Sequence, residues 1–129
     1  MSPDSAKALI MVVSRPEAVE VAVEKLEPEH IGVIMSQNIA EKVIQSCASL
    51  RHSAAFSYRF VDSPMEIGHS FERFEHLLGE LEGAGYGVDE VVLDATGGTT
   101  PMRLGAALAA ITRGIPMVHQ QVPQIYANG

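Results

Sequence analysis

Runs of apolar residues alternate with stripes at helical spacing along this chain, and that alternation limits the folds open to it. Five runs predict strands, at residues 8–14, 30–36, 55–61, 88–96 and 115–122. The first two are continuously apolar, as in strands buried on both faces, whereas residues 55–61 alternate and predict a strand near an edge of the sheet. The methionines in these runs are expected in the core: Met11, Met35 and Met117.

Four helices are predicted between the strands, within residues 15–29, from Asn38 onward, from Ile67 to the glycines of EGAGYG, and at residues 101–113. The apolar stripes that predict them are Val19, Val23 and Leu26; Ile39, Val43, Cys47 and Leu50; Ile67, Phe71, Phe74, Leu78 and Leu81; and Leu104, Leu108 and Ile111. A stripe at this spacing covers one face of a helix, so we expect each to point into the core.

This alternation predicts an α/β fold of the Rossmann type, in one domain over residues 1–129. A helix between two neighbouring strands makes a crossover, so the sheet is mainly parallel and helices cover both of its faces. With the usual strand order 3-2-1-4-5, the winding direction reverses between the first and fourth strands, where ligands of such sheets bind. The loops that meet there are residues 14–17 and 96–101.

Composition narrows the possible partners. The formal net charge of −7 argues against a broad basic surface that binds DNA or RNA, because neutralisation of phosphates dominates the affinity of proteins for nucleic acids. The single cysteine, Cys47, excludes an internal disulfide and a cysteine metal cage, and its place in a helical stripe assigns it to the core. No leader resembles a secretion signal and no apolar run reaches the roughly 20 residues of a membrane span, so we expect a cytoplasmic protein.

The loop at residues 96–101 has the composition of an anion-binding turn. Gly97 and Gly98 can take backbone angles closed to other residues and leave room for a ligand beside the peptide N–H groups. Thr99 or Thr100 can cap the following helix, whose positive end then faces the ligand. Phosphate is the predicted ligand, and a tight structural connection is the alternative. The chain lacks both G-x-x-x-x-G-K-S/T and a G-x-G-x-x-G after its first strand.

The segment VVLDATGGTTPMRLGAALAA resembles the signature of CARF domains, the CRISPR-associated Rossmann-fold sensors of type III CRISPR immunity. The matching positions are Asp94, Thr96, Gly97, Gly98, Thr99 and Met102. Thr100 stands where that family commonly has lysine. The polar loop at Ser14 and Arg15, and the second strand with SQN at its end, fit the same pattern, so the resemblance spans the chain.

The resemblance implies a receptor for cyclic oligoadenylate, most often the ring of four adenosines and sometimes the ring of six. Because such a ring is symmetric, it also implies a homodimer in which each chain offers the same loops to half of the ligand. In this family an effector domain commonly lies on the same chain. Residues 1–129 would then be a sensory domain excised from a longer protein, or a self-standing member.

Two groups of residues form the expected ligand site. The phosphates would be bound by Thr96, Gly97, Gly98, Thr99, Thr100, Pro101, Met102 and Arg103. The floor, or the contacts to adenine and ribose, would come from Ser14, Arg15, Ser36, Gln37 and Asn38, with Gln120 and Gln121 as weaker candidates. Asp94 is expected to orient the loop backbone, because a carboxylate repels phosphate. Met102 is also a candidate to pack against a base.

Two enzymatic functions stay open beside the sensor. A ring nuclease would cleave the messenger with a ribose 2′-OH as the nucleophile, aided by Ser14, Arg15 and Arg103, although the absent lysine is contrary to it. The other is a nucleotide-binding Rossmann-like enzyme, but Ser36 and Gln37 stand where its acidic residue would follow the second strand. The five histidines have no metal-ligand spacing, so we expect no metal and no cofactor.

Overall fold

The computed structural model describes residues 7–50 and 53–119 of the chain. Its strands are β1 (Ala8–Val12), β2 (His30–Ser36), β3 (Ala55–Val61), β4 (Val91–Asp94) and β5 (Met117–Val118). Its α-helices are α1 (Glu17–Leu26), α2 (Ala40–Ala48), α3 (Ile67–Gly83) and α4 (Thr100–Thr112), with short 3-10 helices η2 (Gln37–Ile39) and η3 (Val88–Glu90). All pairings in the described sheet are parallel, in the order β3-β2-β1-β4-β5. The predicted Rossmann-like fold and strand order are confirmed.

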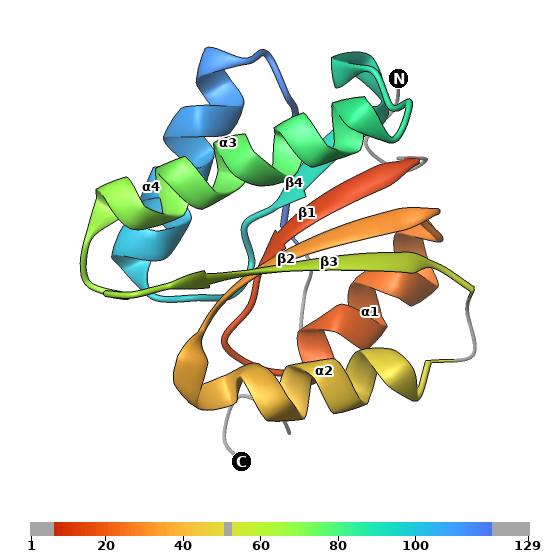
Figure 1. Cartoon of the computed structure of the whole chain (residues 1–129), viewed down its shortest axis with the longest axis horizontal. Coiled ribbons are helices and arrows are strands. Elements are labelled where there is room, and N and C mark those ends of the chain that lie inside the picture. The colour runs from red at the N-terminus through yellow and green to blue at the C-terminus, as the bar shows by residue number, and fades with distance from the viewer. Residues whose placement is uncertain (1–6, 51–52, 120–129) are drawn as a thin grey trace.

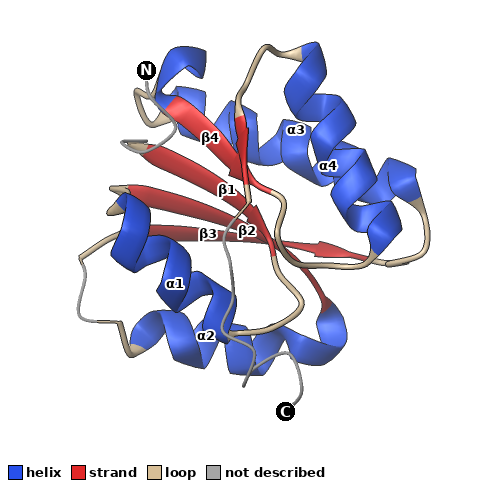
Figure 2. Ribbon diagram, turned by 180° about the vertical axis from the view of Figure 1, so that it is seen from behind, coloured by secondary structure: helices blue, strands red, loops and turns tan. Residues whose placement is uncertain are grey.

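Helices cover the sheet on both sides (Figure 1). The α3 and α4 helices lie together on one face and α1 and α2 on the other, as the view from behind also shows (Figure 2). Every residue of β1 is buried, whereas most of β3, at the edge of the sheet, is half-buried. The continuously apolar run thus forms a central strand, and the alternating run forms an edge strand, as predicted.

Several elements are shorter than the sequence patterns predicted. The first strand ends at Val12, and the first three residues of the predicted fourth strand form η3 instead. The α1 helix ends at Leu26, because Glu27 takes a left-handed conformation with φ of 46° and Pro28 follows it. The fifth strand covers Met117–Val118, and the rest of its predicted range beyond residue 119 lies outside the described residues.

The inward face of α4 differs from the prediction. Small residues and Met102 are buried there, whereas Leu104, Leu108 and Ile111 are 48%, 51% and 63% exposed. The cause is close packing against α3, because a Cβ on Gly105 would lie 2.2 Å from the carbonyl oxygen of Ile67. A face of glycine and alanine lets the two helices approach, so the larger apolar residues point outward. The expectation that Leu104, Leu108 and Ile111 face the core is wrong.

The remaining core predictions are mostly confirmed. Met11, Met35 and Cys47 are buried. Met117 is 44% exposed, contrary to its expected place in the core, because β5 is a short edge strand with an uncovered side. Ile67, the first residue of α3, is also exposed, contrary to its expected place in the core. Within the described residues, no helix has both the length and the apolar character of a membrane span.

Candidate functional site

The loops that follow β1 and β4 lie against each other at the carboxyl edge of the sheet. The two strands are neighbours, with Met11 paired to Asp94. Beyond the strands, a Cβ on Gly97 would lie 2.8 Å from the carbonyl oxygen of Val12 and 3.2 Å from the amide nitrogen of Ser14. The two loops were predicted to meet at the switch point of the sheet, and the fold brings them together there.

The start of α4 presents a row of unpartnered amide groups. Thr99 caps the helix, since its hydroxyl oxygen accepts a hydrogen bond of 3.3 Å from the Met102 amide, and Pro101 lies in the first turn. Among the described residues, no hydrogen bond engages the N–H groups of the four residues from Gly97 to Thr100. These donors and the positive end of a 13-residue helix together favour an anion.

Gly98 is required by the packing of the loop itself. Its φ of 88° lies in the region that favours glycine. A Cβ there would lie 2.3 Å from Cγ1 of Val12, a buried residue at the end of β1. The space beside Gly98, like that beside Gly97, is thus filled by the end of β1, which corrects the expectation that these two glycines leave room for a ligand. Gly98 thus allows the tight turn that connects β4 to the start of α4.

Asp94 orients the loop, as predicted. Its side chain is buried, and Oδ1 accepts hydrogen bonds from the Thr96 amide, at 2.9 Å, and from the Thr96 hydroxyl, at 2.5 Å. The other oxygen, Oδ2, has no hydrogen-bond partner among the described residues. Burial raises the pKa of the Asp94 carboxyl, and the hydrogen bonds from Thr96 oppose that rise. The carboxyl therefore holds the loop from beneath, in the interior of the protein.

The raised pKa of Asp94 makes a prediction for stability. The folded chain holds this proton more tightly than the unfolded chain, so the stabilisation is fully present below the ordinary pKa of 3.8 and is lost as pH rises through the raised value. In Asp94→Asn the amide oxygen can accept the same bonds without ionising. We expect urea unfolding to show a smaller fall in stability between about pH 4 and about pH 7 in the variant than in the wild type. Equal falls in the two proteins would contradict this role for Asp94.

The other predicted site residues lie around the same edge, with one correction. Ser36, at the end of β2, donates to the side-chain oxygen of Asn38 at 2.5 Å. The side chain of Met102 is buried in the core beneath α4, so the expectation that it packs against a base is wrong. The exposed or half-buried candidates are Ser14, Arg15, Ser36, Gln37, Asn38, Thr96, Gly97, Gly98, Thr99, Thr100, Pro101 and Arg103. Gln120 and Gln121 lie outside the described residues.

Arg103 is the cation nearest in sequence to these amides. Its Nη2 atom donates to the Thr100 hydroxyl at 3.3 Å. Its Nε atom is buried and has no partner among the described residues. An unsatisfied buried donor lowers stability, so an acceptor atom of a ligand that reached this guanidinium would be bound favourably. Among residues 7–50 and 53–119, no three His, Cys, Asp or Glu side chains gather as a metal site would require.

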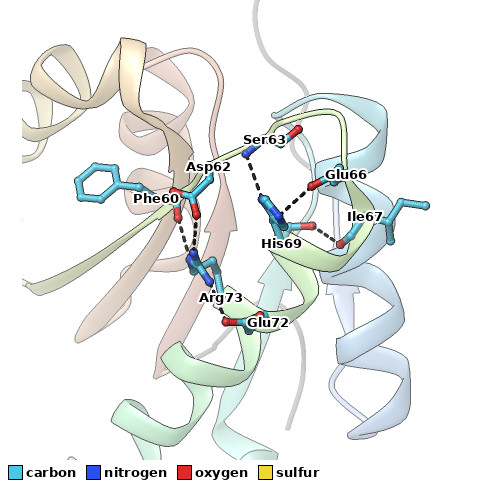
Figure 3. A network of polar contacts seen from close by, with 9 residues as sticks. Phe60, Asp62, Ser63, Glu66, Ile67, His69, Glu72 and Arg73 are labelled. Atoms are coloured by element: carbon cyan, nitrogen blue, oxygen red, sulfur yellow. Dashed lines mark hydrogen bonds and ion pairs between the residues drawn. The ribbon is translucent and has the colours of Figure 1, made fainter.

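The loop between β3 and α3, residues 62–66, borders the candidate site and was not predicted from the sequence. The Thr99 hydroxyl donates to the carbonyl oxygen of Pro64, which places this loop beside the start of α4. Ser63 and Glu66 are both tied to His69 in the first turns of α3 (Figure 3). No local pattern in the sequence indicates this contact, because the two partners are 35 residues apart. The candidate site thus has a third wall.

No protein-family model matches the sequence, and a search of curated proteins finds no match either. Among solved structures, Can2 from Sulfobacillus thermosulfidooxidans in complex with cyclic tetra-adenylate superposes with a TM-score of 0.74 at 16% identity, over 90% of this chain and 31% of Can2. The chain has the fold of that part of Can2.

Two further solved structures have a similar fold. Csm6 from Enterococcus italicus, bound to cyclic hexa-2′-fluoro-hexa-dAMP, matches with a TM-score of 0.72 at 15% identity, over 95% of this chain and 35% of Csm6. A type III CRISPR defence DNA nuclease activated by cyclic oligoadenylate matches with a TM-score of 0.65 at 19% identity, over 84% of this chain and 18% of the nuclease. The chain spans only about a third of these proteins or less. These structures share with the chain the Rossmann-like fold that the resemblance to CARF domains implied.

Proposed function

We propose that this chain is a CARF-type sensory domain that binds cyclic oligoadenylate at the start of α4. The observation that carries the proposal is the row of four amides from Gly97 to Thr100, unpartnered among the described residues and located at the switch point of the sheet. Two neighbours in fold are solved with rings of this kind. Binding would control an effector domain, which in the resembled family commonly lies on the same chain.

The charges of the site suit a phosphate ring. The chain as a whole carries a formal charge of −7, so an anionic ligand must be attracted locally. The amides and the helix dipole supply this attraction at the start of α4. Arg103 adds a cation from the first turn, and Arg15 adds another from the loop after β1. Thr100 replaces the lysine of the resembled family with a hydroxyl, so these two arginines supply the charge of the missing lysine.

The symmetry of the ring supports a homodimer, and α4 offers a face for it. Leu104, Leu108 and Ile111 form one exposed stripe, and Met117 lies near it on β5. Between α4 and β5 is a hollow of about 430 Å³, lined in part by Leu104 and Met117. An uncharged apolar stripe can face its own copy without like-charge repulsion, in a chain that is otherwise acidic. We place the two-fold axis beside this stripe, so that both α4 amide rows reach one ring.

Calorimetry with the full chain tests the proposal. We expect cyclic tetra-adenylate to bind with one ring per two chains, and the ring to be recovered intact after hours of incubation. The six-membered ring, titrated in parallel, reports the preferred size. Linear di-adenylate among the products would show cleavage, and would favour a ring nuclease that uses Ser14, Arg15 and Arg103 over a sensor. Absence of binding for both rings would overturn the proposed function.

A further inference from the structure

The β3–α3 loop, residues 62–66, holds one large apolar side chain in solvent beside the candidate site. Met65 is 71% exposed, more than any other large hydrophobic residue in the described part of the chain. An exposed methionine is not costly by itself, but its surroundings here are unusual. It belongs to a short loop that is fastened at several points and lies next to the start of α4.

Side chains of α3 fasten this loop from below (Figure 3). The Ser63 amide donates to Nδ1 of His69 at 3.0 Å, and Nε2 of His69 lies 2.8 Å from the Glu66 carboxylate. At the end of β3, Nε of Arg73 donates to the Phe60 carbonyl oxygen at 2.7 Å. Met65 therefore projects from a loop that is anchored on both sides of it, and its exposure does not come from a loosely held segment.

A second set of contacts joins the loop to α4. The Thr99 hydroxyl, which caps α4, donates to the carbonyl oxygen of Pro64, the residue before Met65. Two residues after Met65, the carbonyl oxygen of Ile67 packs against Gly105. The backbone on either side of Met65 thus contacts the helix whose first amides are proposed to bind phosphate. Met65 therefore lies on a loop whose backbone contacts both the cap and the second turn of α4.

We propose that Met65 is a base-contacting residue of the ligand site, which packs its thioether against the face of an adenine. This inference rests on the proposed function. A thioether is apolar and polarisable and donates no hydrogen bond, so it suits the flat face of a purine better than a phosphate. The buried Met102 cannot take this part, whereas Met65 lies one loop away with its side chain in solvent.

Variants of Met65 test the inference by calorimetry with cyclic tetra-adenylate. Met65→Ala removes the thioether from an exposed position, so the fold is unaffected, and we expect ring binding about three- to tenfold weaker. Met65→Leu keeps the apolar contact and should bind more tightly than the alanine variant. The matched control is Ile44→Ala, which truncates an exposed apolar residue on α2, across the sheet from α4. This control should bind as the wild type does.

Oxidation provides a readout independent of affinity. In the full chain, peroxide converts exposed methionine to its sulfoxide, and mass spectrometry reports the rate at Met65. Saturating cyclic tetra-adenylate should slow oxidation at Met65, whereas inorganic phosphate, which has no base, should not. Wild-type affinity in Met65→Ala, or unchanged oxidation with the ring bound, would overturn the inference and leave the proposed function standing. A wild-type chain that binds no ring would instead overturn the proposed function.

Discussion

The Gly98→Ala variant is expected to lose ring binding and to fold less stably. The added Cβ would lie 2.3 Å from Val12 Cγ1, at a φ of 88° that alanine rarely adopts, so the loop must shift. We expect a loss of about 1–3 kcal/mol in the free energy of unfolding, from strain and overpacking. A shift of the loop moves the amides away from a phosphate and breaks charge-assisted hydrogen bonds. The loss of each such bond should weaken ring binding by roughly 10- to 150-fold. Urea unfolding and calorimetry measure the two effects.

Gly114→Ala is the matched control for this variant. Gly114 also has a positive φ, of 70°, but a Cβ there would meet nothing within 4 Å. The control should therefore lose about 1–2 kcal/mol from the left-handed conformation alone. It should keep wild-type affinity for the ring, because it follows the far end of α4. Similar ring affinities in Gly98→Ala and Gly114→Ala would remove the loop at residues 96–99 from the site.

A carboxylate on the apolar stripe of α4 is expected to separate the proposed dimer. In Leu108→Asp the charge would be buried beside the two-fold axis, facing its copy across the interface, and both effects oppose association. The side chain is 51% exposed in the single chain, so the fold itself should tolerate the change. We expect a dimer dissociation constant raised by roughly 30-fold or more, with ring affinity falling in parallel. Analytical ultracentrifugation and calorimetry report these quantities.

Ile44→Asp on α2 is the control for the dimer prediction. It places the same charge at a residue that is 39% exposed on the opposite face of the sheet. We expect this variant to stay dimeric and to bind the ring as the wild type does. If Leu108→Asp also remains a dimer of wild-type affinity, then α4 is not the interface. A wild-type chain that binds a whole ring as a monomer would refute the shared site.

The fold could be predicted from the sequence because it depends on the pattern of apolar residues over whole segments and not on single contacts. Apolar runs separated by helical stripes allow few arrangements, and the parallel order with its switch point follows from crossover rules. The cap at Thr99 and the orienting role of Asp94 were also predictable, because both act within a few residues along the chain. Local hydrogen bonds of this kind can be inferred from residue type and spacing.

Other features could not be inferred because they depend on contacts between distant segments. The stripe at Leu104, Leu108 and Ile111 was assigned to the core by hydrophobicity, but Gly105 and its alanine neighbours let α3 pack closely and exclude the larger residues. The same packing buries Met102. Whether a glycine makes room for a ligand or for its own protein, as Gly98 does, depends on the neighbouring strand.

The central claim is that the N–H groups from Gly97 to Thr100 bind the phosphates of a cyclic oligoadenylate. Amide spectra of the ¹⁵N-labelled chain, recorded while cyclic tetra-adenylate is added, test it most directly. The claim predicts that the amide resonances of Gly97, Gly98, Thr99 and Thr100 show the largest downfield proton shifts, because new hydrogen bonds to phosphate deshield those protons. Shifts confined to other parts of the chain, with these four resonances unmoved at saturation, would contradict it.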